Sequence, residues 1–432
     1  MAFFDKKDEF QKWKYRVAQF ILLYPDGSKF ELPPERIQSI SITHSYETAW
    51  YPVFRTEVIL EPSVYYSIIK YKDDIQIKLR ILKYYTKIGS GPEVTTFIDT
   101  SPNTSLTRNY IDGKFDLILD DQNFDVDEYI KIDEKRFDFE HVTKDDKNDL
   151  FKTDNKIELF LFKSSLIDKG NQIVNAVLHD ASVTDAITYI LYAAKYKNVL
   201  LSPIQNKDIY SELIIPPLKA KEALQYIGTY YGYYKNGYII YVDFTTGKTY
   251  ILNRSGKCTA WEANEYTETD FIIPNDKESC TLGRKKSKNI NYIIGHSSTM
   301  AIRNESTSLN AYSSLDSLSI DSYTGDVVSS KSNASSKGTV SVKVLSDTTE
   351  NKWFKTLHSS LNDSKNTVMQ ITASDYDASA IAPNKRYKVL FENSKLAEKY
   401  KDDYIMSECI HTFTKTGADF SITSVFTMQK CD

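Results

Sequence analysis

The chain has 432 residues, of which 41% are hydrophobic, and its 54 basic and 58 acidic side chains give a net charge of -4. At roughly 150 residues per domain, this length predicts about three domains with real cores and excludes a disordered chain. The near balance of charge disfavours a dedicated binder of nucleic acid or anionic membranes, because such proteins carry a basic excess. No run approaches the ~20 apolar residues of a membrane span, and the N-terminus lacks the order of a signal peptide. We therefore expect a soluble protein that is not exported by that route.

The residue types that carry chemistry are sparse and scattered. The four cysteines form no C-x-x-C pair, so reduced thiols are favoured over a disulfide framework or a zinc site. They are Cys258, Cys280, Cys409 and Cys431. The six histidines form no H-x-x-x-H pair, and the phosphate-binding and nucleotide-binding glycine motifs are absent from the sequence. We predict no catalytic residues, no cofactor, no metal site and no enzyme activity.

Two charged runs have both a functional and a structural interpretation. The acidic run 121–132 alternates like a calcium loop, but Val126 and Ile132 occupy the positions that need glycine and a bidentate glutamate. Its alternating residues are Asp121, Asn123, Asp125 and Asp127. The run 284–288 carries four positive charges that can contact phosphate. For both runs we favour a solvated segment over a binding site.

The first 165 residues read mostly as β-structure. The clearest strand is 73–85, where Ile75, Ile77, Leu79 and Ile81 alternate with more polar residues, which indicates one buried face. The other predicted strands are 14–24, 36–44, 114–119 and 156–162. Several strands at short spacing with few helices are typical of a barrel or a sandwich.

Residues 166–252 have the pattern of a small α/β unit. Ser182 and Asp185 form a capping box before a helical run, and a second helix is predicted to end near Gly228. Asn236-Gly237 then stands between two aromatic runs, and this pair is typical of a type I′ turn in a β-hairpin.

From 253 onward the pattern is β again, with one Ser-rich stretch at 297–338. That stretch has few apolar residues, so we expect a long loop or a disordered insertion. The predicted strands are 289–294, 339–345, 385–391, 403–413 and 418–428.

Three stretches together resemble the baseplate hub proteins of contractile phage tails and the hub part of type VI secretion spikes. The first is a helix followed by a structural hairpin, which contains Tyr231, Gly232, Tyr233, Asn236, Gly237, Tyr241 and Asp243. The second is the C-terminal run that includes 381–387 and 413–428. The third is the pair of strands around Tyr51-Pro52-Val53.

The resemblance implies two tube-like β-barrels, at 1–165 and 253–432, that flank the α/β unit at 166–252. Three chains would then form a pseudo-sixfold ring, which joins the sixfold tail tube to the threefold central spike and encloses the DNA exit channel. The implied partners are two further copies of the chain, the tail tube protein and the central spike protein, with the tape measure and baseplate wedge proteins as additional candidates. DNA would pass without specific binding. The implied location is the virion tail baseplate, assembled in the host cytoplasm without membrane contact.

Two other classes of protein remain open from the sequence. The 31 tyrosines suit subunit interfaces, and they equally suit a receptor-binding or carbohydrate-binding tail protein or another structural tail protein. A cell-wall hydrolase is the third class, since hub assemblies sometimes carry lytic domains, but no catalytic set supports it in this sequence. Binding to a glycan array and a zymogram on bacterial cell walls would distinguish these classes.

Overall fold

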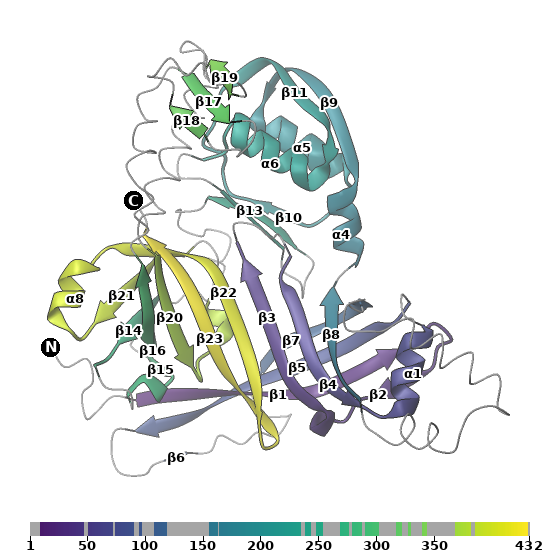
Figure 1. Cartoon of the computed structure of the whole chain (residues 1–432), viewed down its shortest axis with the longest axis vertical. Helices are drawn as coiled ribbons and strands as arrows, with labels where there is room; N and C mark the ends of the chain where they lie inside the picture. Colours follow the sequence, from purple (N-terminus) through teal and green to yellow (C-terminus); the bar gives the residue numbers. More distant parts are fainter. Residues whose placement is uncertain are drawn as a thin grey trace.

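Strands dominate the computed structural model of the chain, and helices gather in its middle part (Figure 1). This confirms the predicted class, mainly β with an α/β part. The described residues are 9–46, 51–71, 74–89, 95–96, 108–118, 155–162, 164–234, 238–242, 248–253, 268–275, 279–286, 290–301, 317–321, 327–329, 339–343, 368–381 and 385–430.

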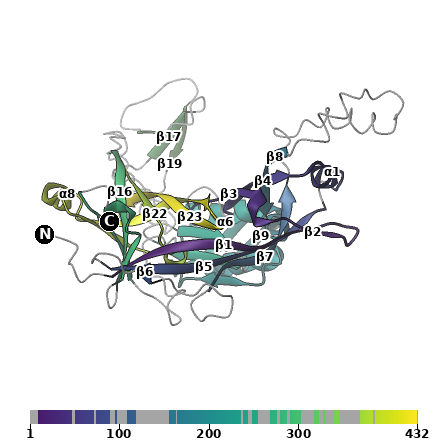
Figure 2. The ribbon, with the colours of Figure 1, turned by 90° about the horizontal axis from the view of Figure 1, so that it is seen from below.

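The N-terminal part forms long antiparallel strands, as the alternating pattern predicts. On β5, Ile77, Leu79 and Ile81 are buried while Gln76 and Lys78 point outward, so one face lies on the core. β1 and β5 run side by side over their whole length (Figure 2). The elements are β1 (Glu9–Leu23), β2 (Lys29–Glu31), η1 (Pro34–Arg36), β3 (Ile37–Ser45), β4 (Val53–Leu60), α1 (Pro62–Lys70), β5 (Gln76–Gly89), β6 (Thr95–Thr96), β7 (Arg108–Ile118) and β8 (Asn155–Phe162).

The C-terminal part supplies a second group of strands to the same sheet. Its last two strands form a hairpin whose turn contains Gly417 at a positive φ of 67°. The elements are β14 (Glu268–Ile273), η3 (Ser279–Thr281), β15 (Arg284–Lys286), β16 (Ile290–Ala301), β20 (Val368–Ser374), η5 (Ala378–Ala380), β21 (Tyr387–Phe391), α8 (Ser394–Lys399), β22 (Asp403–Thr416) and β23 (Asp419–Lys430).

Among the described residues, the two groups of strands share one 15-stranded sheet whose pairings close on themselves. The first strand ring runs through β1, β23, β22, β3, β4, β8, β7 and β5 and returns to β1. The second strand ring runs through β23, β20, β16, β14, β21 and β22. The hairpin β22–β23 belongs to both rings, so strands from opposite ends of the chain complete the first ring. The arrangement as two tube-like barrels, and the domain bounds predicted above, stay predictions.

The middle part forms an α/β layer with its own hydrophobic core. The capping box of Ser182 and Asp185 is confirmed at the start of α5, and α6 continues two residues beyond Gly228. β9 and β11 pair as an antiparallel two-stranded ribbon, while β10, β13 and β12 form a separate sheet. The elements are α4 (Ser164–Asn171), β9 (Ile173–Ser182), α5 (Val183–Ala193), β10 (Val199–Leu201), β11 (Ile209–Lys219), α6 (Ala220–Tyr230), β12 (Tyr238–Val242) and β13 (Thr249–Asn253).

Two predictions for the C-terminal part are wrong. The Ser-rich stretch contains strands: β16 continues to Ala301 because it pairs with β20, and two further strands fall inside 297–338. These are β17 (Ser317–Asp321) and β18 (Val327–Ser329). Together with β19 (Thr339–Lys343) they form a small three-stranded sheet in which β17 is the central strand. The basic run is also not a solvated turn at its first residue, because Arg284 is buried in β15, while residues 287–288 lie outside the described residues.

Several predicted features lie outside the described residues. They are the acidic run 121–132, Cys258, Cys431, and the remaining parts of the Ser-rich stretch at 302–316, 322–326 and 330–338. The other two cysteines, Cys280 and Cys409, form no disulfide with each other.

Candidate assembly surface

Within the described residues, no group of three or more His, Cys, Asp or Glu side chains could hold a metal ion. No helix in that part of the chain is long and apolar enough to cross a membrane. The features that stand out are instead an exposed apolar surface and the buried polar groups that support the sheet.

The ribbon β9–β11 carries hydrophobic residues on its outer face as well as its inner face. Leu213 and Ile215 point inward to the core, while Val177 and Ile214 are directly opposite one another and exposed. The exposed fraction lies between 46% and 68% for the four apolar residues Ile173, Val177, Ile209 and Ile214. A sheet with one solvated face normally alternates apolar with polar residues. Here the exposed apolar residues share the outer face with the exposed Asn175, His179 and Glu212, and they make this face a candidate contact surface.

Two tyrosines on the helices of the same layer are also exposed. Tyr192 on α5 is 83% exposed and Tyr230 at the end of α6 is 54% exposed. The ring of Tyr230 lies 4.4 Å from that of Tyr226, measured between centroids. Together with the four ribbon residues, these are the strongly exposed large hydrophobic residues of the described part of the chain. We call the four ribbon residues Ile173, Val177, Ile209 and Ile214 the assembly surface.

The segment after α6 fixes the end of that helix. Gly232 has a positive φ of 77°, the conformation that often terminates a helix. The fully buried Asn206 amide donates to the carbonyl oxygens of Tyr231 at 2.7 Å and of Gly232 at 3.1 Å. The hydroxyl of Tyr233 donates to the carbonyl of Leu224 inside α6. Residues 231–233 are thus held by the Asn206 side chain, which donates to their first two carbonyls, and by the Tyr233 hydroxyl, which donates to the backbone of α6.

The structure therefore differs from the predicted hairpin. Residues 231–234 are all buried and form no strand, because four consecutive tyrosine or glycine positions pack around the helix end instead of alternating between two faces. β12 pairs with β13, which follows it, with Ile240 opposite Ile251. The predicted turn and strand end, Asn236, Gly237 and Asp243, lie outside the described residues.

Tyr241, the remaining hairpin residue, connects the α/β layer to the large sheet. Its ring lies 5.8 Å from Tyr46 and 5.9 Å from His44, both at the end of β3. A second connection is made by Tyr51 and Tyr196, whose hydroxyl oxygens are 3.4 Å apart. The sequence reasoning selected Tyr241 but missed its partners, since they are distant in the chain.

Replacing Asn206 with Leu is expected to lower the free energy of unfolding by about 2–3 kcal/mol. The variant leaves the buried carbonyls of Tyr231 and Gly232 without their donor, at a cost of roughly 1–3 kcal/mol for each unsatisfied group. Urea unfolding would measure the loss. The exposed Asn109 on β7 is the control position, where Asn109→Leu should change stability by less than about 0.5 kcal/mol. Equal effects at both positions would contradict a structural role for Asn206.

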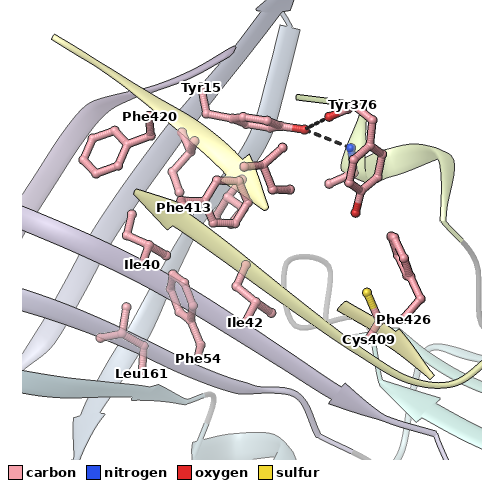
Figure 3. Packing of buried hydrophobic residues seen from close by; sticks show 14 of the residues in the cluster. Tyr15, Ile40, Ile42, Phe54, Leu161, Tyr376, Cys409, Phe413, Phe420 and Phe426 are labelled. Carbon is pink, nitrogen blue, oxygen red and sulfur yellow. Dashed lines mark hydrogen bonds between the residues drawn. The ribbon is translucent and has the colours of Figure 1, made fainter. Parts of the chain in front are cut away.

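A buried polar cluster joins the N-terminal strands to the segment after β20. The phenol of Tyr15 donates to the carbonyl of Tyr376 at 3.0 Å and accepts from the backbone N–H of Ala378 at 2.9 Å (Figure 3). Figure 3 also shows apolar side chains of the first strand ring around Tyr15. Those from β3, β22 and β23 are Ile40, Ile42, Phe413 and Phe420.

Charged side chains in the same region are paired although they are buried. The Lys83 ammonium lies 2.8 Å from Asp377 Oδ1, and the Arg284 guanidinium lies 3.9 Å from Asp377 Oδ2. Both cations also lie near the indole of Trp13, at 5.2 Å and 5.9 Å from its ring. Burial lowers the pKa of Arg284, while Asp377 acts against that change. In the sequence, the feature that points to this cluster is the basic run 284–288, because Arg284 belongs to it. Its charge alone favours a solvated segment and does not reveal the pairing with Asp377.

The chain thus combines a β-rich sheet, an α/β layer and an exposed apolar surface. A family model described as the Bacteriophage PBS1 gene 109 protein matches residues 9–431. The chain belongs to this family.

The chain is also similar to solved structures of tail proteins. The 43 kDa tail protein of prophage MuSo2 from Shewanella oneidensis has 10% identity and a TM-score of 0.46, with 98% of this chain and 99% of that one covered. The tail protein from Neisseria meningitidis MC58 has 9% identity and a TM-score of 0.44, with 98% and 96% covered. A type VI secretion component from E. coli has 7% identity and a TM-score of 0.41, with 97% and 77% covered.

No curated protein matches the chain. The resemblance to a phage protein, inferred above from three stretches of sequence, is confirmed by the phage family.

Proposed function

We propose that the chain is the baseplate hub of a phage tail, a homotrimeric ring that joins the sixfold tail tube to the threefold central spike. The observation that carries this proposal is the pair of closed strand rings, of eight and six strands, that share the hairpin β22–β23. Three copies present six such rings, which match a sixfold partner on one side, while the trimer itself matches a threefold partner on the other. A chain with one strand ring would need six copies to do the same.

A closed trimer needs two different surfaces on each subunit. In a cyclic ring of three, each subunit contacts one neighbour with one patch and the other neighbour with a second patch. The assembly surface supplies apolar residues on the strands β9 and β11. We propose that these residues contribute to the contact between subunits.

The charge of the chain supports a DNA channel that does not bind DNA specifically. The net charge is -4, so a ring of three chains is acidic overall. An acidic lumen would let the DNA phosphates slide, whereas a basic lumen would hold them. The tail tube and spike proteins are the proposed partners, with the tape measure and wedge proteins as further ones, and the virion tail baseplate is the proposed location.

The experiment is the solution mass of the purified protein combined with low-resolution electron microscopy. The proposal expects a mass of three chains and particles with a central hole and threefold symmetry. A folded protein that stays monomeric at high concentration, and also with its tube and spike partners, would contradict it. Hydrolysis of cell walls that is lost on substitution of a single residue would contradict it as well.

A further inference from the structure

His411 lies sealed inside the wall that both strand rings share. It projects from β22, and together with the neighbouring Ser424 of β23 it is almost completely buried. Its Nδ1 is 2.8 Å from Ser424 Oγ and 3.0 Å from the hydroxyl of Tyr376, and its Nε2 is 3.3 Å from Cys409 Sγ. The ring is therefore surrounded by two hydroxyls and a thiol, all of them uncharged groups.

The hydrogen bonds form a chain that suits a neutral imidazole. The Tyr376 hydroxyl donates to Ser424 Oγ at 2.8 Å, which leaves the Ser424 hydroxyl to donate to His411 Nδ1. Nδ1 then accepts, and the proton of the neutral ring lies on Nε2, beside the sulfur of Cys409. A second proton on Nδ1 would have to reverse this chain of donors.

His44 places a second imidazole next to His411 and extends the cluster to the α/β layer. The two imidazole centroids are 5.8 Å apart, and His44 is the cross-strand partner of Cys409 in the pairing of β3 with β22. On its other side, His44 lies 5.9 Å from Tyr241 of β12. The cluster thus lies where β3, β22 and β12 meet.

The titratable groups around His411 offer no negative charge to a protonated ring. Burial raises the pKa of the Cys409 thiol and of the Tyr376 phenol well above their ordinary values, so both are neutral at physiological pH. Phenols come from β3 with Tyr46 and from β12 with Tyr241. β23 contributes the uncharged Ser424 and Phe426.

Two carboxylates belong to the neighbouring sequence, and each has another role. Glu408 precedes Cys409 on β22 and helps to raise the pKa of that thiol. Asp377 follows Tyr376 and pairs with Lys83 and Arg284. A positive charge on His411 would consequently be buried without a close anionic partner, which is costly.

We propose that His44 and His411 form an acid-sensitive joint, which holds β3, β22 and β12 together at neutral pH and loosens when His411 takes up a proton. The shared hairpin would then separate from β3, and the first strand ring would open. This inference does not depend on the proposed hub function, because it concerns contacts within one chain.

The direction of the pH effect follows from proton linkage. Burial, and secondly the neighbouring His44, hold the pKa of His411 well below its ordinary value of about 6.5. Below that pH the opened form binds a proton that the closed form does not, so stability falls as the pH falls. One such proton raises the opening equilibrium constant by up to tenfold for each pH unit below about 6.5. The effect stops below the pKa of the closed form.

The test compares urea unfolding of the full chain between pH 5 and 7.5 for three proteins. The wild type should lose stability below pH 6.5, and His411→Gln should lack that part of the pH dependence. His179→Gln, which changes an exposed histidine on β9, should follow the wild type. Identical pH dependence in the wild type and in His411→Gln would overturn the proposal.

A measurement on the wild type alone covers the case in which His411→Gln fails to fold. Hydrogen–deuterium exchange at pH 5.5 and 7.5, corrected for the intrinsic exchange rates, should show lost protection in peptides from β3, β22 and β12 at the lower pH. The ribbon β9–β11 should keep its protection. Equal protection of β3 and β22 at both pH values would overturn the proposal.

Discussion

The double variant Val177→Glu with Ile214→Lys is expected to fold normally and to lose the trimer. The two positions are direct cross-strand neighbours on the exposed face of the ribbon, so the new side chains can pair with each other. The subunit should therefore keep its stability to within about 1 kcal/mol. If the ribbon face lies in the contact between subunits, however, the two charged side chains would lose their water there and replace apolar contacts. The affinity of the subunits for one another should then fall strongly.

Analytical ultracentrifugation would measure this result, with urea unfolding as the check on the fold. The matched control is Val177→Ile with Ile214→Val, which keeps the total apolar volume and should keep the trimer. If the charged variant remains trimeric, the ribbon face is not the contact, and the hub proposal itself still depends on the mass of the wild type. If the wild type is monomeric under all conditions, the hub proposal fails regardless of this variant.

Replacing Asp377 with Asn is expected to lower the free energy of unfolding by about 3–5 kcal/mol. The carboxylate is the anion that lies beside two buried cations, Lys83 at 2.8 Å and Arg284 at 3.9 Å. The side chains of Lys83 and Asp377 are only 7% and 11% exposed, so water cannot solvate the charge that is left behind. The loss should appear in urea unfolding and as a lower melting temperature.

The double variant Lys83→Met with Asp377→Asn separates the cost of an unpaired charge from other effects. The double variant also removes the Lys83 ammonium, which is left unpaired in Asp377→Asn, so it should recover part of the lost stability. Removing both partners of a buried ion pair costs less than leaving one charge buried without its partner. The exposed pair Arg80 and Asp112, 3.9 Å apart, provides the control. Asp112→Asn should cost less than about 1 kcal/mol. A cost for Asp377→Asn no larger than for Asp112→Asn would contradict the proposed role of the cluster.

The sequence by itself determined the elements whose signals are local. The alternation at 75–81 predicted a strand with one buried face, and β5 has it. Ser182 and Asp185 predicted the start of α5, because a capping box needs only residues three apart. The pattern of the last 30 residues predicted two strands, and these are β22 and β23. Local periodicity is enough here because one side of each element meets solvent.

Local signals failed where neighbouring elements changed the environment of a residue. The aromatic run at 231–234 has strand propensity, yet it packs around the end of α6, since the buried Asn206 supplies donors to its carbonyls. Arg284 reads as a solvated cation in the sequence, but β15 places it beside Asp377, which is distant in the chain. Residues 297–301 lack a strong apolar pattern and still form a strand, because β20 supplies hydrogen-bond partners.

Only the tertiary structure decided how the two β parts combine and where candidate contacts lie. Binary patterns carry no information on which strands pair, so the sharing of β22–β23 between two strand rings is absent from the sequence signal. The tertiary structure also shows that the ribbon of β9 and β11 has one face in solvent. The contact of His411 with Ser424 and Tyr376 likewise depends on register between distant segments. Pairing and register are set by the global packing of the chain, because a strand can satisfy its backbone hydrogen bonds with many partners but can bury its apolar face with few.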